Sequence, residues 1–209
     1  MILQSAVLIT TLSLISAVTA LGQTTCSDPH YRWSEKIDAS FATKTPIAVD
    51  VSDILGSWAP RSITQADKCA KRVGREKNVY AVTGWVRRIK KHETDFDWHI
   101  ELTENEDDTP VKAACIVVEI PSPNEGAIYG QARSELAGFV DTTGLGQTGD
   151  VNPPVQVTFI GAAFFDGYHQ KKGVNGGPPK ASQHGRCNSS VRALWELHPV
   201  YRLEAPGGP

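Results

Sequence analysis

The chain has 209 residues, of which 40% are hydrophobic and 21% are charged, a balance typical of one globular domain with a core. The net charge of -2 excludes recruitment of nucleic acid by an overall positive field. The 18 glycines and 13 prolines favour short strands and turns over long helices.

The chain begins with an uncharged, apolar stretch. Residues 1–20 end in Val18-Thr19-Ala20, the small residues that a signal peptidase reads, and we interpret them as a secretory signal peptide. An uncleaved membrane anchor is the alternative, because the segment is just long enough to span a bilayer. The first interpretation predicts an exported protein, periplasmic or extracellular, that is not inserted in a membrane after cleavage.

Four cysteines form an even set, Cys26, Cys69, Cys115 and Cys187. In an oxidising compartment they predict two disulfides, and three pairings are possible. We favour Cys115–Cys187, because Cys115 opens one predicted strand and Cys187 shortly precedes its expected neighbour. Cys26–Cys69 would then tie down the segment that precedes the strands.

The predicted elements begin with an irregular N-terminal extension over residues 21–77. Period-two alternation then predicts strands, and spacing of three and four predicts a helix within 128–140. A long polar loop covers 167–190, and 205–209 form a loose tail. The predicted strands are 79–90, 94–103, 112–120, 155–166 and 192–203.

Three strands, a helix and two strands are the order of an OB-fold, a five-stranded barrel with its helix between strands 3 and 4. We therefore predict a mostly β protein with an OB-like barrel over 78–204. A five-stranded α+β sandwich is the alternative.

The segment 94–102 carries the clearest alternation. Trp98 and Ile100 point to one face, and Asp97, His99 and Glu101 point to the other. This alternation predicts that Trp98 is buried and that His99 is largely exposed.

Four short motifs resemble an uncharacterised family of exported prokaryotic proteins with an OB-like fold. The resemblance covers roughly 78–204, with Val118 where the family usually has Ala. It supports the fold boundaries and the choice of site residues, and it implies no reaction. The motifs are Asp95-Phe96-Asp97-Trp98-His99, Val118-Glu119-Ile120-Pro121, Phe164-Phe165-Asp166-Gly167-Tyr168-His169 and Glu196-Leu197-His198-Pro199-Val200.

The polar faces of the predicted strands carry imidazoles and carboxylates, which are ligands for a divalent metal ion. His99, Glu119 and His198 are the predicted ligands, with Asp166 or His169 as a fourth. Such a site would support a metal-assisted hydrolase, for example a nuclease or a phosphodiesterase. Asp97 and Glu196 would orient the imidazoles. A solvent-facing strand normally carries charges, so a purely structural role stays open.

Basic residues gather in the two regions that bind ligands in an OB-fold. With aromatic residues such as Trp85 and Tyr168 they favour single-stranded nucleic acid or another polyanion, although an ordinary solvated rim has the same composition. Our first interpretation of the chain is thus an exported OB-like binding protein of unknown ligand, and the metal-assisted hydrolase is the alternative. The candidate ligand-binding residues are Arg87, Arg88, Lys90, Lys91, Lys171 and Lys172, with Lys180 and Arg186 nearby.

Overall fold

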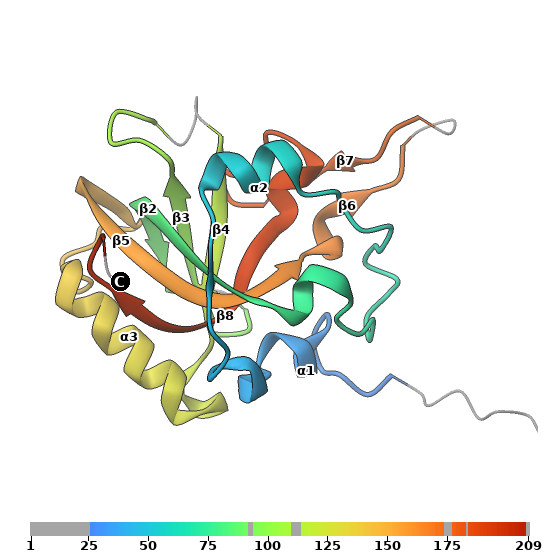
Figure 1. Cartoon of the computed structure of the whole chain (residues 1–209), viewed down its shortest axis with the longest axis horizontal. Coiled ribbons are helices and arrows are strands. Elements are labelled where there is room, and N and C mark those ends of the chain that lie inside the picture. Colours follow the sequence, from blue (N-terminus) through green and yellow to red (C-terminus); the bar gives the residue numbers. More distant parts are fainter. Residues whose placement is uncertain (1–25, 92–93, 110–113, 174–176, 183, 208–209) are drawn as a thin grey trace, which may run out of the picture.

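We describe a computed structural model of the chain, which covers residues 26–91, 94–109, 114–173, 177–182 and 184–207 (Figure 1). The predicted signal peptide at 1–20 lies outside these described residues. Three α-helices occur among them: α1 (Trp33–Lys36), α2 (Val51–Ser57) and α3 (Ala127–Phe139). The strands are β1 (Ile47–Ala48), β2 (Val79–Lys90), β3 (Trp98–Thr103), β4 (Cys115–Ile120), β5 (Asp150–Phe165), β6 (Gln170–Lys171), β7 (Lys180–Ala181) and β8 (Trp195–Glu204).

The predicted strands and the predicted helix are all present, with shifted ends. β3 begins at Trp98 rather than at 94, because Thr94 and Asp95 form a turn and Phe96 adopts a left-handed φ of 64°. β5 begins at Asp150 rather than at 155, because the chain pairs with β2 before the two prolines. Residues 112–113 of the predicted third strand lie outside the described residues.

Five strands pair in the order β2-β3-β4-β8-β5, and β1 adds to β2 as a sixth. Because β2 also pairs with β5, each of the five has a neighbour on both sides. The β4–β8 pair is parallel, and the other pairs among the five are antiparallel. The helix α3 lies along β8, and the β6–β7 ribbon projects at the opposite end of the molecule (Figure 1).

One face of these strands forms the hydrophobic core, as alternation predicts. Ile100, Val118 and Leu197 from neighbouring strands are fully buried in it. Side chains of the N-terminal extension join the same cluster, among them Val51, Ile54 and Trp58. The extension therefore packs on the core that the strands form.

The expectation of an exposed His99 was wrong, because the opposite face of the strands is covered rather than wet. His99 is 6% exposed, and Trp98, expected to be buried, is only half-buried. The helix α1 and the loop after β5 lie over the polar face, where Lys36 approaches Glu119 and Gly185 packs on His99. The alternation also placed Phe96 on the apolar face, but Phe96 precedes β3 and is 71% exposed. Within β3 the alternation separates the two faces, but it carries no information about what covers the polar one.

Both favoured disulfides are present. Cys115–Cys187 joins β4 to the long loop, and Cys26–Cys69 closes the extension. Among the described residues there is no helix with the length and apolar character that crossing a membrane requires.

Candidate metal centre

A pocket of about 710 Å³ opens between α1, β3, β4 and the loop that follows β5. Its walls combine carboxylates, imidazoles and basic side chains. The carboxylates are Asp95, Glu119 and Asp166; the histidines are His30, His99, His169 and His184; the basic residues are Lys36, Arg88, Lys90, Lys171 and Arg186.

Three side chains present ligand atoms to one another, and two of them, Asp166 and His184, line this pocket. Asp166 follows β5, Glu196 lies on β8, and His184 lies in the long loop; all three are buried. His184 Nε2 lies 3.2 Å from Glu196 Oε2 and 4.0 Å from Asp166 Oδ2. One atom from each residue can be chosen so that all three lie within 4.8 Å of one another.

The other polar atom of each residue is already fixed by a hydrogen bond. The backbone N–H of Tyr168 donates to Asp166 Oδ1 at 3.0 Å, and His184 Nδ1 lies 3.1 Å from the carbonyl oxygen of Ala193. Glu196 Oε1 lies 3.3 Å from His198 Nδ1. An imidazole that donates one N–H to a backbone carbonyl presents its other nitrogen as an acceptor, the usual arrangement of a metal-ligating histidine.

His169 extends this group toward solvent. Its Nε2 lies 3.7 Å from Asp166 Oδ2, and its backbone oxygen accepts hydrogen bonds from the N–H and the hydroxyl of Ser182. Ligands at about 2.0–2.2 Å from a tetrahedral ion lie roughly 3.4 Å from each other. The measured separations of 3.2, 3.7 and 4.0 Å bracket that value. We call Asp166, His169, His184 and Glu196 the pocket set.

The pKa values of the pocket set shift in different directions: burial and Glu119 would raise the pKa of Glu196, but His184 and His198 lower it to about 2. Burial, and next the Glu196 carboxylate, raise the pKa of Asp166. Burial would lower the pKa of His184, but Glu196 raises it. Burial lowers the pKa of His169, so that imidazole is neutral and available as a ligand.

A second group of candidate ligands, which we call the deep set, consists of Asp97, Glu119 and His198. His198 is fully buried, with Nε2 3.1 Å from Asp97 Oδ2 and Nδ1 2.9 Å from Glu119 Oε2. Burial and the charge of Lys36 would lower the pKa of His198, but Glu119 and Asp97 raise it well above its usual value. The two ring nitrogens of an imidazolium thus face different carboxylates, and neither Asp97 nor His198 lines the pocket.

The predicted triplet of His99, Glu119 and His198 is brought together as a chain of polar contacts. His99 Nδ1 lies 3.0 Å from Glu119 Oε1, and His198 approaches the other oxygen of the same carboxylate. Burial would lower the pKa of His99, but Glu101 and Glu119 raise it to about 9. Asp97 and Glu196, predicted to orient imidazoles, both lie against His198.

Two residues of the site, His184 and Lys36, were missed by the sequence prediction, whereas Glu101 was placed on the polar face and Arg186 among the basic residues of the long loop. A signal for His184 was present: it lies three residues before Cys187, and the predicted disulfide with Cys115 brings that segment onto β4. For Lys36 the sequence held no such signal, because nothing in the irregular extension indicates which strand this residue will contact.

The loop is held on the strands by a glycine and an ion-pair network. Gly185 has a left-handed φ of 57°, and a Cβ there would lie 2.5 Å from both Glu101 Oε1 and His99 Nε2. Next to it, Arg186 donates to both oxygens of Glu101, through its backbone N–H at 2.9 Å and its Nε at 2.5 Å. Burial would raise the pKa of Glu101, but His99 and Arg186 lower it to about 2.

Three of the six predicted basic ligand-binding residues donate hydrogen bonds within the protein. Arg87 donates to Thr103 and to backbone oxygens of the next turn, and Arg88 donates to the Thr148 carbonyl and to Glu101. Lys91 donates to the Thr142 carbonyl and lies over Trp98. Lys90 and Lys171 line the pocket, and Lys172 is exposed away from it.

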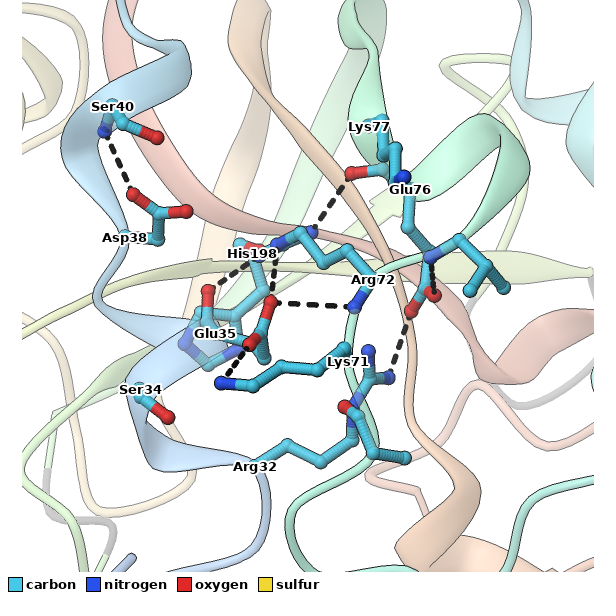
Figure 2. A network of polar contacts seen from close by, with 12 residues as sticks. Arg32, Ser34, Glu35, Asp38, Ser40, Lys71, Arg72, Glu76, Lys77 and His198 are labelled. Carbon is cyan, nitrogen blue, oxygen red and sulfur yellow. Dashed lines mark hydrogen bonds and ion pairs between the residues drawn. The ribbon is translucent and has the colours of Figure 1, made fainter.

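Two buried arginines fasten α1 behind the deep set. Arg72 donates to the carbonyl oxygens of Glu35 and His198, both at 2.6 Å, and Figure 2 shows it between these residues. Arg32 pairs with Glu76 at 2.7 Å and donates to the Phe165 carbonyl. These bonds fix the backbone of β8 and of α1, and so the positions of His198 and Lys36.

Comparison of the chain with protein-family models, with curated proteins and with solved structures found no match.

Proposed function

We propose that the protein is a metal-assisted hydrolase that holds one divalent ion, with zinc as the first candidate, at Asp166, His169, His184 and Glu196. The observation that carries the proposal is that acceptor atoms of the pocket set face one another. His184 Nδ1 lies 3.1 Å from the Ala193 carbonyl oxygen, and Nε2 faces two carboxylates, with Glu196 Oε2 at a hydrogen-bond distance of 3.2 Å. Such an arrangement is stable only with a proton or a metal ion between the acceptors.

The pocket supports hydrolysis rather than a buried structural ion. Asp166, His169 and His184 line a cavity large enough for a small substrate. A bound ion would lower the pKa of a water molecule and polarise the scissile bond. His99 lines the same cavity as an imidazolium, because its pKa is about 9, and is the group suited to give a proton to a leaving oxygen. Water then adds across the ester bond and yields an acid and an alcohol.

The strand order supports the inference of an OB-fold. Of the features expected of an OB-fold, β3 pairs with β4, β4 pairs with β8, and α3 lies in sequence between β4 and β5. Two disulfides support an oxidising, exported environment and, with it, a signal peptide at 1–20. Membership in the exported prokaryotic family rests on the four sequence motifs.

Polyanion binding is the second candidate function, favoured by the five lysine and arginine side chains in the pocket wall. The engagement of Arg87, Arg88 and Lys91 in internal hydrogen bonds gives it less support than the metal centre. Fluorescence anisotropy with a labelled single-stranded oligonucleotide tests it: binding that persists after removal of metal would favour this candidate.

Metal uptake tests the first proposal. The protein, stripped with a chelator, is titrated with zinc by calorimetry, and its metal content is measured after dialysis. We expect one ion per chain in the wild type and loss of uptake in His184→Ala. His30→Ala is the matched control, because His30 lines the pocket from the exposed extension and belongs to neither candidate set. Absence of stoichiometric zinc in the wild type, or equal uptake by His184→Ala, would contradict the proposal.

A catalytic assay completes the test. The zinc-loaded protein is offered chromogenic phosphomonoester, phosphodiester and carboxylic ester substrates, and turnover is compared with that of the metal-free protein. Turnover of an ester that requires the metal, and that is lost in His184→Ala but kept in His30→Ala, is the expected result. A nuclease or phosphodiesterase is the specific form that we expect.

A further inference from the structure

Lys36 is a buried cation whose N–H groups have no hydrogen-bond partner among the described residues. Its Nζ lies 3.6 Å from Asp95 Oδ2 and 3.8 Å from Glu119 Oε2, distances of ion pairs that are too long for hydrogen bonds. Burial would lower the pKa of Lys36, but Glu119, and after it Asp166 and Glu196, raise it, so the amine stays charged. Because Lys36 lines the pocket, its three donors are available to a ligand there.

Tyr31 presents a second donor from the same segment. Its hydroxyl is buried and has no hydrogen-bond partner among the described residues, although the residue lines the pocket. Burial raises the pKa of the phenol, which therefore stays protonated. A Cβ at residue 167 would lie 2.6 Å from the Tyr31 oxygen, so Gly167, next to the ligand candidate Asp166, leaves room for this hydroxyl.

Both donors are held in place from behind. Arg32, which lies between them in sequence, adopts a left-handed φ of 48° and is fully buried. Its side chain donates to Ala70, Glu76 and Phe165, while Arg72 holds the carbonyl of Glu35 (Figure 2). A non-glycine residue in this conformation persists only where the surroundings fix it. The extension is thus anchored so that Tyr31 and Lys36 face the pocket.

We propose that the substrate of this metal centre carries a phosphoryl group, and that Lys36 and Tyr31 of the N-terminal extension bind its oxygens. This inference rests on the proposed function and adds the residues that would recognise the phosphoryl group. Three kinds of group that attract phosphate oxygens would face the cavity: the bound ion as a Lewis acid, and an ammonium and a phenol as hydrogen-bond donors. A phosphoryl group has enough terminal oxygens to contact all three at once, whereas a carboxylate has two.

The charge of the cavity agrees with a doubly charged ligand. Five lysine and arginine side chains line it against three carboxylates, and a divalent ion would add two further positive charges. Charge-assisted hydrogen bonds from an ammonium to phosphate oxygens are among the stronger polar contacts in proteins. The extension therefore supplies the substrate-binding wall, and the strands and the long loop supply the metal.

Inorganic phosphate is the probe that tests this inference. The full chain is loaded with one equivalent of zinc and titrated calorimetrically with phosphate and, separately, with acetate. We expect Lys36→Met to weaken phosphate binding by about 10- to 100-fold and Tyr31→Phe by about 3- to 10-fold, as for the loss of a charged and of a neutral hydrogen bond. Lys36→Arg retains the charge and should restore most of the affinity. Lys68→Met, which removes an exposed lysine outside the pocket lining, is the control and should change the affinity by less than about 2-fold.

Zinc content, measured for every variant, separates the two proposals. A wild type that takes up no zinc contradicts the metal centre itself. Zinc-loaded protein in which Lys36→Met binds phosphate as the wild type does contradicts only the present inference, as does acetate binding as tight as phosphate binding. If Lys36→Met fails to fold, Tyr31→Phe decides, because it removes a single oxygen: unchanged phosphate affinity in that variant overturns the inference.

Discussion

The pocket set and the deep set contain the same residue types and differ in how their charges are paired. In the deep set, the His198 imidazolium lies between Asp97 and Glu119, and Lys36 and His99 approach Glu119 as well. In the pocket set, two carboxylates and two imidazoles face one another, and the pKa of His169 is lowered. The deep set thus holds its carboxylates against an imidazolium and a lysine, whereas burial lowers the pKa of one of the two imidazoles of the pocket set.

This difference shows why a cluster of histidines and carboxylates is not by itself a metal site. What matters is which charges already lie against the carboxylates. His198 presents both nitrogens to carboxylates, while His184 presents one to a backbone carbonyl and the other to the Glu196 carboxylate, where a metal ion could replace a proton. The deep set is then expected to orient Glu196 and to stabilise the fold, and the pocket set to bind the ion.

The largest expected effect is on stability in the deep set. His198→Ala would leave Asp97, Glu119 and Glu196 buried without their shared partner, which should cost about 3–5 kcal/mol in the free energy of unfolding. Urea unfolding of the metal-free protein measures this loss.

The matched variant for that test is His169→Ala in the pocket set. Its side chain is 30% exposed and makes one long ionic contact, so the expected cost is below about 1 kcal/mol. Equal losses in the two variants would remove the distinction between the sets.

The next effect in size is on metal affinity in the pocket set. Asp166→Asn keeps the oxygen that accepts from Tyr168 and weakens the one that faces His184. We expect zinc affinity to fall by about 100-fold, as for loss of a charged ligand, with the metal-free stability unchanged or slightly increased because the repulsion from Glu196 is removed.

Asp95→Asn provides the control for that variant, since Asp95 lines the pocket and pairs with Lys36 outside both sets. It should bind zinc as the wild type does. A larger loss of zinc in Asp95→Asn than in Asp166→Asn would mean that the ion lies on the α1 side of the pocket.

The smallest expected effect concerns Glu101, a well-paired carboxylate that contrasts with Asp166. Its folded pKa is about 2, below the ordinary value of 4.5, so the unfolded chain takes up the proton first as the pH falls. The stability from this group is therefore present above pH 4.5 and is lost as the pH falls toward 2. Glu101→Gln should be less stable than the wild type by about 1–3 kcal/mol near neutral pH, and the gap should close at acid pH.

Chemical denaturation at a series of pH values, with the exposed Glu106→Gln as control, measures that gap. A difference between Glu101→Gln and the wild type that stays constant from pH 7 to pH 2 would show that Glu101 acts through packing and not through its charge.

The strands and the core could be predicted from the sequence because alternation is a local property. Ile100, Val118 and Leu197 lie in the core as the pattern predicts, and the even number of cysteines led to both disulfides. The same alternation correctly predicted that His99, Glu119 and His198 lie on one face of the strands. These features depend on neighbouring residues or on a covalent bond with few possible partners.

The segments that cover the polar face could not be predicted, because their sequences show neither helical nor strand periodicity. Lys36 reaches Glu119 from 83 positions away, and His184 lies in a loop whose position only its disulfide indicates. His99 was expected to be exposed because the strand pattern does not report that α1 and the loop lie over it. The charge pairing that distinguishes the pocket set from the deep set depends on the same two segments, α1 and the long loop.

The central claim, that the ion binds at the pocket set, is tested most directly by a crystal structure of the zinc-soaked protein with anomalous diffraction at the zinc edge. The account predicts one anomalous peak about 2.0–2.2 Å from His184 Nε2 and from carboxylate oxygens of Asp166 and Glu196. A peak between Asp97, Glu119 and His198, or no peak at saturating zinc, would contradict it.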